Sequence, residues 1–487
     1  MTIIHRPADL DPDLISAIAR GRRISLSSAL LSEVAASRAA TLRDLAGDQP
    51  VYGVNTGMGA FSGVRLDAAA QARHQDTLMA GRAVGSAPWL GRGEARAMLA
   101  VRLRTLLHPA AGVSPQLCLH LAALLNADIV PAIPARGAGA AGEIIQLAHA
   151  GAVLLGTGQV LDAAGRAADA APALAAAGLS PRGFEAKEGV AFLQGVPGLT
   201  GLAILSARAA RTLVDQIVVI SGIEQAVAQA SLDPLHPALG SGDEELSAIL
   251  AALRAVRGEG PVRALQAPVS FRVTAPALAV AVRAVNGLEA AASRALTAVT
   301  DSPAHLDGRF VGTTGFAGTD LAAACDALTA ALVHLAEVGA TRLHRLLDDA
   351  VTGLPRQLSG SPGRYAGMAT VHKRAAGVAH RLRRFAMPAL IGPMETSLGQ
   401  EDVQSFGFEA ASSLGEAVAG LRDVLACELL AVHQARLLGG TVPAGQLGAL
   451  DRVAAVLPAG VADRPFGRDL DVLIGLLAGN LFGRDTE

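Results

Sequence analysis

The chain has 487 residues, of which 51% are hydrophobic, 3% aromatic and 17% charged, with a formal net charge of −2. A chain this close to neutral has no electrostatic basis for binding nucleic acid or an anionic membrane surface. Its three cysteines lie far apart and form neither a CxxC pair nor an even-numbered framework, which favours a reducing, cytoplasmic location.

The mean hydropathy of +0.39 comes from alanine and leucine spread evenly along the chain. The best uncharged window, 189–207, is interrupted by Gln194, Pro197 and several glycines, so we expect no transmembrane helix. Residues 1–23 mix acidic and basic side chains without an apolar segment, and no secretory signal is expected there.

Glycine and proline cluster at 51–63, 131–142 and 195–201, a pattern typical of loops between short helices. We therefore predict a loop-rich, mainly helical domain over 1–200. From 201 to 487 long amphipathic patterns dominate, and these predict a helix bundle with a small helical appendage after Pro443.

The predicted long helices share apolar residues spaced three and four apart. They cover Ala207–Ser231, Thr319–Ala350, Met368–Phe385 and Glu409–Leu438. The best strand-like segment is Val269–Thr274, and it is short. The predicted fold class is therefore all-α.

The segment Gly137-Ala-Gly-Ala-Ala-Gly142 matches the GxGxxG pattern of dinucleotide-binding loops. Its surroundings do not fit that pattern, because Pro131 and Pro134 interrupt the strand that should precede it. Glu143 would also place a negative charge where a pyrophosphate should bind. We interpret the segment as a loop of small residues followed by a helix over Glu143–Leu155.

Tyr52 is one of only two tyrosines and lies in the glycine-rich segment YGVNTGMG, Tyr52–Gly59. Glycines allow positive φ and close approach of the backbone to a ligand. A tyrosine presented there can accept a proton if nearby cations lower its pKa from about 10. The alternative, a tyrosine that packs a tight turn, is equally compatible with this motif alone.

Seven segments, in this order, resemble the histidine and phenylalanine ammonia-lyase family. They are YGVNTGMG (Tyr52–Gly59), IPARGAGAAGEIIQLAH (Ile133–His149), KEGVAFLQG (Lys187–Gly195), VSFR (Val269–Arg272), TDSP (Thr300–Pro303), GTTGFAG (Gly312–Gly318) and GQED (Gly399–Asp402). The resemblance implies an almost wholly helical, fumarase-like architecture and a homotetramer whose active sites are shared between subunits.

The resemblance also implies roles for individual residues. Tyr52 corresponds to the base that removes a proton, with Gly59 and Glu401 in the catalytic set, and Arg272 corresponds to the residue that binds the substrate carboxylate. The other residues implied to bind substrate are Asn55, Arg82, Gln194, Val269 and Phe316.

The tripeptide that carries the family's chemistry is different in this chain. Family members have Ala-Ser-Gly, which cyclises and loses water to form an electrophilic methylidene-imidazolone. The matching residues here are Ala140, Ala141 and Gly142, in a loop one residue shorter than usual. Alanine has no hydroxyl to expel, so we predict that this prosthetic group is absent and expect no other cofactor.

Further positions depart from the family pattern. Gln194 and Val269 replace an asparagine and a tyrosine, Gly315 and Ala317 replace an asparagine and a histidine, and Arg82 replaces a histidine that faces the substrate. Two arginines near Tyr52 would favour an anionic substrate and would help to hold the tyrosine as phenolate. Arg82 as a surface residue and Glu401 as a helix cap are the alternatives.

The sequence therefore predicts a lyase-like enzyme that works without the methylidene-imidazolone on a small carboxylate-bearing substrate, such as an amino-acid derivative or a diacid. Tyr52 would remove a proton, leading to elimination, isomerisation, addition or cyclisation. The alternatives are a conventional aromatic amino acid or histidine ammonia-lyase or aminomutase, and a non-catalytic binding or scaffold homologue. The twelve histidines show no metal-ligand spacing, and no metal is expected.

Overall fold

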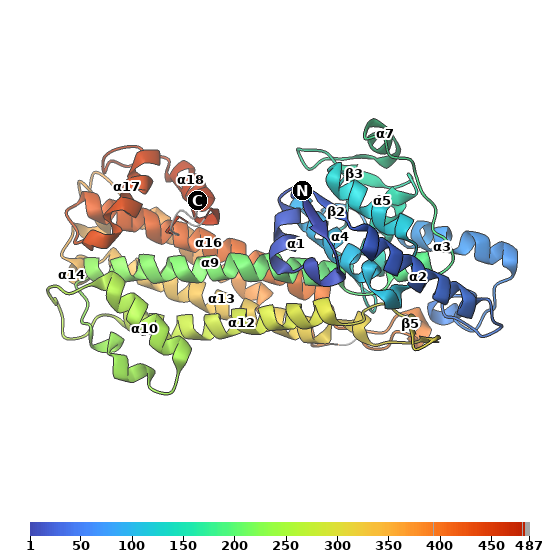
Figure 1. Ribbon diagram of the computed structural model, residues 1–487. Helices are drawn as coiled ribbons and strands as arrows, with labels where there is room; N and C mark the ends of the chain where they lie inside the picture. Colours follow the sequence, from blue (N-terminus) through green and yellow to red (C-terminus); the bar gives the residue numbers. More distant parts are fainter. Residues whose placement is uncertain (393, 480, 483–487) are drawn as a thin grey trace. The chain divides into compact units, whose positions relative to one another are not determined.

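A computed structural model describes residues 1–392, 394–479 and 481–482, and most of them are helical. Figure 1 labels the main elements. The predicted all-α class is confirmed.

The helices of the first 200 residues are α1 (Pro12–Ala19), α2 (Ser28–Leu45), α3 (Ala68–Arg82), α4 (Arg92–Leu107), α5 (Pro115–Asn126), α6 (Ile144–Leu154), α7 (Ala170–Ala176), α8 (Glu188–Leu193) and the start of α9 (Pro197–Val227). The later helices are α10 (Glu244–Arg257), α11 (Val269–Arg272), α12 (Thr274–Thr297), α13 (Thr319–Leu346), α14 (Asp349–Thr352), α15 (Ala369–Leu382), α16 (Gly407–Leu437), α17 (Leu447–Val456) and α18 (Phe466–Ala478).

The chain divides into two compact units that are discontinuous in sequence. The first unit contains Met1–Leu205, Leu288–Cys325 and Pro388–Ser412, and the second contains the segments between them and the chain from Ser413 onward. The boundary expected near residue 200 falls close to the end of the first segment. The first unit also takes in two later segments, because α9, α12, α13 and α16 each begin in one unit and end in the other.

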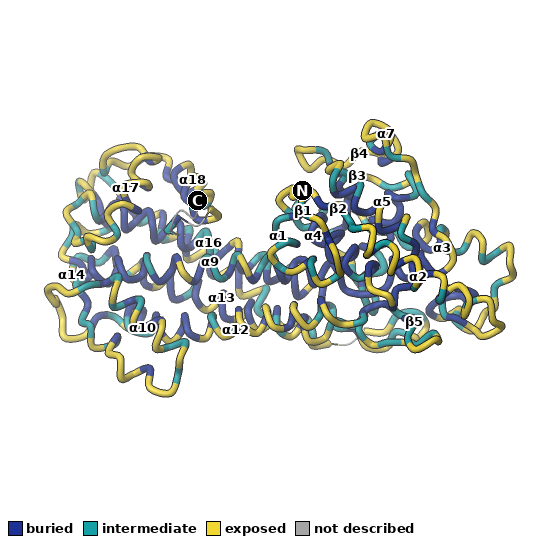
Figure 2. Tube along the Cα trace, in the orientation of Figure 1, coloured by how far each residue is buried: buried dark blue, intermediate teal, exposed yellow. Residues whose placement is uncertain are grey.

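In the second unit, parts of α9, α12, α13 and α16 form a helix bundle (Figure 1). Arg342 of α13 contacts Glu224 of α9, Thr274 of α12 and Glu428 of α16 through its guanidinium group. The apolar stripes predicted for these helices are buried, and Figure 2 shows buried residues along the bundle. Burial of these stripes explains why long helices of modest intrinsic stability persist.

Three of the predicted elements differ from the structure. The helix predicted over Ala207–Ser231 is α9, which begins at Pro197 and ends at Val227. α13 ends at Leu346 rather than Ala350, because Asp348 caps a new helix, α14, by accepting a hydrogen bond from the Ala350 N–H. The strand predicted over Val269–Thr274 is wrong, since Val269–Arg272 forms the one-turn helix α11. Its β-branched valines suggested a strand, but Phe271 is buried while Val269 is 58% exposed, which breaks the alternation that a strand face requires.

The strands are short and lie in the first unit. β1 (Thr2–Ile4) and β2 (Ile24–Leu26) pair in parallel, β3 (Gln159–Leu161) pairs with β4 (Ala167–Asp169), and β5 (Ala304–Leu306) pairs with β6 (Arg309–Val311), the last two pairs being antiparallel. The β5–β6 hairpin carries Phe310 opposite His305. This hairpin supplies one wall of the site described below.

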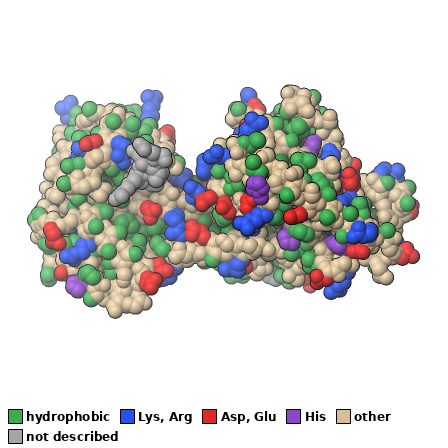
Figure 3. All heavy atoms as spheres, viewed as in Figure 1, with side chains coloured by type: hydrophobic (Ala, Val, Ile, Leu, Met, Phe, Trp, Pro, Cys, Tyr) green, Lys and Arg blue, Asp and Glu red, His purple; other side chains and the backbone are tan. Residues whose placement is uncertain are grey.

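Two helical stretches are long and apolar enough to cross a membrane by length and composition alone, 188–227 and 315–346. In the first, 89% of the most apolar window is buried inside the protein, and in the second 56% is. Buried core helices of soluble proteins have the same properties, so these stretches are weak evidence for a membrane span. On the face drawn in Figure 3, basic and acidic side chains are interspersed.

Candidate active site

The Tyr52 loop is fixed by hydrogen bonds within itself. The Tyr52 hydroxyl accepts a hydrogen bond of 2.8 Å from the backbone N–H of Gly59, which has a φ of +58°. Asn55 accepts from the Val51 N–H at 2.7 Å and donates to the carbonyl of Gln49 at 2.9 Å. The side-chain amide of Asn55, which was predicted to bind substrate, thus closes the loop through these two hydrogen bonds.

Gln75 of α3 joins the Tyr52 loop to α8. Its amide donates to the carbonyl of Gly53 at 3.0 Å and accepts from the Val190 N–H at 3.1 Å. Gly53 has a positive φ, and a Cβ there would lie 2.9 Å from side-chain atoms of both Met58 and Val190. A glycine is therefore required next to Tyr52, as the sequence suggested.

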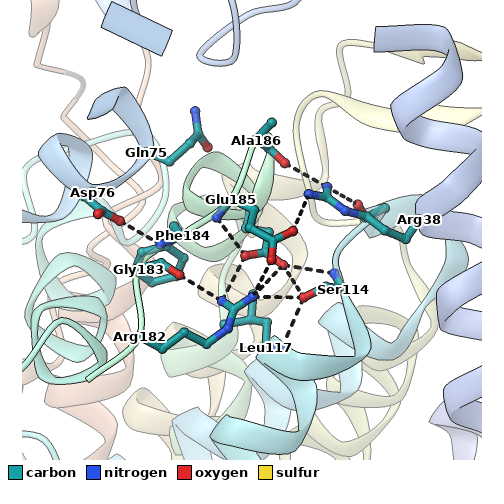
Figure 4. Close-up of polar contacts among 12 residues, drawn as sticks. Arg38, Gln75, Asp76, Ser114, Leu117, Arg182, Gly183, Phe184, Glu185 and Ala186 are labelled. Carbon is teal, nitrogen blue, oxygen red and sulfur yellow. Dashed lines mark hydrogen bonds and ion pairs between the residues drawn. The ribbon is translucent and has the colours of Figure 1, made fainter. Parts of the chain in front are cut away.

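A buried polar cluster holds the segment before α8 (Figure 4). The Glu188 carboxylate accepts hydrogen bonds from the Ser114 hydroxyl at 2.5 Å and from Arg182 at 2.9 Å, and Arg38 donates to the carbonyl of Ala186 at 2.7 Å. Burial opposes ionisation of Glu188, but the hydrogen bonds from Arg182 and Ser114 outweigh it and lower the pKa of this carboxyl. The segment leading to Gln194 is thereby fixed.

Gln194 itself is positioned by Arg102 of α4. The fully buried Arg102 guanidinium donates to the carbonyl of Ala191 at 3.0 Å and to the carbonyl of Gln194 at 2.6 Å, and burial lowers its pKa to about 10. Asp301, whose charge faces Arg102, forms a buried ion pair with Lys187. These charges tie together segments that are more than 100 residues apart.

The Ala140–Gly142 tripeptide lies beside Glu401. The backbone N–H of Ala141 donates to the Glu401 carboxylate at 2.8 Å. Gly142 has a φ of +100°, and a Cβ at this position would lie 3.5 Å from the carbonyl oxygen of Phe316. Glu401 also accepts from Ser397 at 3.2 Å, within a loop that precedes the start of α16 at Gly407. The alternative of Glu401 as a helix cap does not describe this geometry.

Glu143, directly after the tripeptide, has a role that the sequence did not indicate. Its two carboxylate oxygens accept from the Gly198 and Leu199 N–H groups, both at 2.6 Å, at the N-terminus of α9. Burial raises the pKa of this carboxyl to about 7, although those two N–H groups and Arg102 act in the opposite direction. The partners are 55 and 56 residues away, so no local pattern could have found them.

Two cavities of the first unit meet at Tyr52, Ile144 and Glu401. The first has a volume of about 480 Å³ and the second about 630 Å³. The first is also lined by Ala141, Gln194, Ser302, Phe310, Phe316 and Asp402, and the second by Gly59, Arg82, Ala140, Thr396, Ser397 and Leu398. Most residues predicted for the site therefore line one space or the other. Phe310 is an additional lining residue that lies outside the motifs, and Ser302 lies within the TDSP motif but was given no role there.

The electrostatics of Tyr52 differ from the expectation of a lowered pKa. Burial raises the pKa of the Tyr52 phenol above its ordinary value, and the nearby Glu401 charge raises it further. The Gly59 N–H and the Arg82 charge lower it, but they do not overcome burial. Burial therefore accounts for most of the difference, and the single arginine charge that acts on Tyr52 among the described residues is too weak to reverse it.

Arg272 and Val269 lie in the second unit. The Arg272 side chain donates to the carbonyl of Ala267 at 2.9 Å and lines a cavity of about 190 Å³ with Gln225 and Phe271. Neither Arg272 nor Val269 lines the two cavities around Tyr52. Among the described residues, no group of three or more His, Cys, Asp or Glu side chains could hold a metal ion.

Comparisons with known proteins agree with this architecture. The family model for aromatic amino acid lyases matches residues 10–454. The chain is 31% identical to a histidine ammonia-lyase of Deinococcus radiodurans, over 98% of this chain and 94% of that protein. Its fold is similar to a tyrosine aminomutase from Streptomyces globisporus (TM-score 0.91, 24% identity, 98% of this chain and 97% of that one). It is also similar to the ergothioneine-degrading ergothionase of Treponema denticola (TM-score 0.91, 22% identity, 99% and 100%). The chain, a lyase-family enzyme, belongs to the aromatic amino acid lyase family.

Proposed function

We propose that this enzyme acts on a small carboxylate-bearing substrate by proton abstraction at Tyr52, without a methylidene-imidazolone group. The observation that carries the proposal is the side chain at position 141, a methyl group at the wall of the Tyr52 cavity. A serine hydroxyl at this position would be the leaving group from which the electrophile forms. The residues present do not fit the family's prosthetic group, and no step depends on it.

The chemistry available to the chain is that of a base beside a polar cavity. Tyr52 would take a proton from a carbon near the substrate carboxylate, and the electron pair left behind would form a double bond as a leaving group departs, or would attack another centre. Gly59 and Arg82 favour the phenolate that this requires. Because the pKa of Tyr52 is raised, the rate should increase as the pH rises toward that pKa.

The resemblance supports two further expectations about the assembled enzyme. We expect a homotetramer in the cytoplasm, in which Arg272 of another subunit binds the substrate carboxylate. A guanidinium group suits that role because it binds a carboxylate through two parallel hydrogen bonds. This arrangement would complete a site to which the same chain's Arg272 does not contribute.

The second candidate function is a conventional ammonia-lyase or aminomutase, which the similarity to histidine ammonia-lyases favours. The two candidates differ in their response to borohydride or cyanide, nucleophiles that consume an electrophilic double bond. They also differ in whether histidine, phenylalanine or tyrosine is converted to its unsaturated acid.

The experiment is a screen of carboxylic and amino acids in D₂O by proton NMR, with and without prior borohydride treatment. We expect exchange of a carbon-bound proton or formation of product for at least one acid, at a rate that borohydride leaves unchanged. Conversion of histidine, phenylalanine or tyrosine that borohydride abolishes would contradict the proposal in favour of the conventional lyase. Binding of acids with no exchange or turnover would favour the scaffold homologue.

A further inference from the structure

The larger cavity beside Tyr52 is mostly apolar around one positive charge. Arg82 is the last residue of α3, and Met58, Phe61, Ile144 and Leu398 are among the apolar residues that line the same space. Among the described residues that line either cavity, Arg82 is the only lysine or arginine. The other cavity has Glu401 and Asp402 in its wall and no cation.

The Arg82 guanidinium has no hydrogen-bond or ion-pair partner within the described part of the chain. The Arg82 charge interacts electrostatically with Tyr52 and Glu401. The Glu401 carboxylate, however, already accepts hydrogen bonds from the Ala141 N–H and from Ser397. Burial lowers the pKa of Arg82, yet a guanidinium in a protein stays protonated. Five N–H donors are therefore held at an apolar cavity wall, where an unpaired charge is costly.

We propose that Arg82 binds an anionic group of the substrate other than the carboxylate assigned to Arg272, so the substrate is a diacid or an amino acid with an acidic side chain. The inference rests on the proposed function in two respects: the Tyr52 cavities are the substrate site, and Arg272 of another subunit binds the first carboxylate. Glu401 lines both cavities, but Asp402 lines only the smaller one and Arg82 only the larger one, so an anionic group is favoured on the Arg82 side. Arg82 then determines specificity, and neutral aromatic side chains are excluded.

A carboxylate fits this position better than a phosphate. The planar guanidinium matches a carboxylate through two parallel hydrogen bonds and balances its single charge. A phosphate dianion would leave one negative charge uncompensated near Glu401. The second acidic group is therefore assigned as a carboxylate.

The test compares succinate with succinamate, which has the same shape but carries one carboxamide in place of a carboxylate. Binding to the full-length protein is measured by calorimetry at neutral pH. We expect the unmodified protein to bind succinate roughly tenfold or more tightly than succinamate, because a charged hydrogen-bonded pair is replaced by a neutral one. Arg82→Met and Arg82→Gln should each abolish this preference.

Arg73→Met is the matched control, because Arg73 is exposed on the same helix and lines neither cavity. It should keep the full preference for succinate. Equal binding of the two acids by the unmodified protein would overturn the inference, as would a preference that survives in both Arg82 variants. Tighter binding of inorganic phosphate than of succinate would overturn the carboxylate assignment. Each of these failures concerns binding and leaves proton abstraction by Tyr52 to be judged separately.

Discussion

Replacement of Tyr52 by phenylalanine is expected to lower the rate of proton exchange or turnover roughly 10²- to 10⁴-fold, the range over which general-base groups contribute. The variant keeps the ring that packs in the loop and loses the hydroxyl that accepts from the Gly59 N–H. The rate is measured in D₂O by NMR on whichever acid the screen identifies. Because the pKa of Tyr52 is raised, the difference between the two proteins should widen as the pH increases.

Tyr365→Phe provides a matched control, since the chain has only these two tyrosines. Tyr365 lies in the second unit and lines neither of the Tyr52 cavities. The control should exchange protons at the rate of the unmodified protein. A Tyr52→Phe enzyme that retains full activity would remove tyrosine from the mechanism and direct attention to Glu401, the other titratable group that both cavities share.

Replacement of Arg342 by methionine is expected to destabilise the protein by about 3–5 kcal/mol, the cost of leaving buried charges without their partner. Arg342 is buried between Glu224 and Glu428 and also donates to the Thr274 hydroxyl at 3.1 Å. Burial and the Glu428 charge raise the pKa of Glu224 well above its ordinary value. One guanidinium therefore serves two buried carboxyls. Burial also raises the pKa of Glu428, and the raised pKa values favour a proton shared by the two carboxyls, which balances the charges of the group.

The free energy of unfolding is measured by chemical denaturation at neutral pH. Glu224→Gln should cost much less than Arg342→Met, because glutamine is uncharged and the raised pKa of Glu224 favours an uncharged side chain at this position. Arg345 lies one turn after Arg342 on α13 and forms a partly exposed ion pair with Asp348. Arg345→Met should change stability by about 1 kcal/mol or less. A loss below about 1 kcal/mol for Arg342→Met would contradict the assignment of this group as a buried charge centre.

The helical character of the fold could be predicted because long segments whose apolar residues recur with a period near 3.6 are typical of amphipathic helices. The strand prediction failed at Val269–Arg272 because the periodicity of four residues is too short a signal to distinguish a helical turn from a strand. A single boundary along the chain could not describe the two units, because α9, α12, α13 and α16 pass from one unit to the other. The periodicity of apolar residues indicates that a segment is helical, but it does not indicate where along the helix the packing partners change.

The candidate site was predictable where short motifs carry the residues, as for Tyr52, Glu401 and the Ala140–Gly142 loop. The supporting charges were not predictable, because Glu143 and Arg102 act on backbone groups more than 50 residues away. The pKa of Tyr52 depends on burial, which a sequence does not display. Arg82, which the resemblance aligned with a residue that faces the substrate, is the last residue of α3 and lines the cavity wall.

The measurement that tests the account most directly is the mass of the intact purified chain. Without a hydroxyl at residue 141, the loop cannot lose the second water molecule that creates the methylidene. We expect no ring closure over 140–142 either, so that the mass equals that of the translated sequence. Peptides spanning the loop should show the same unmodified composition. A deficit of two water molecules, located to Ala140–Gly142, would mean that the electrophile forms after all and would contradict the proposed chemistry.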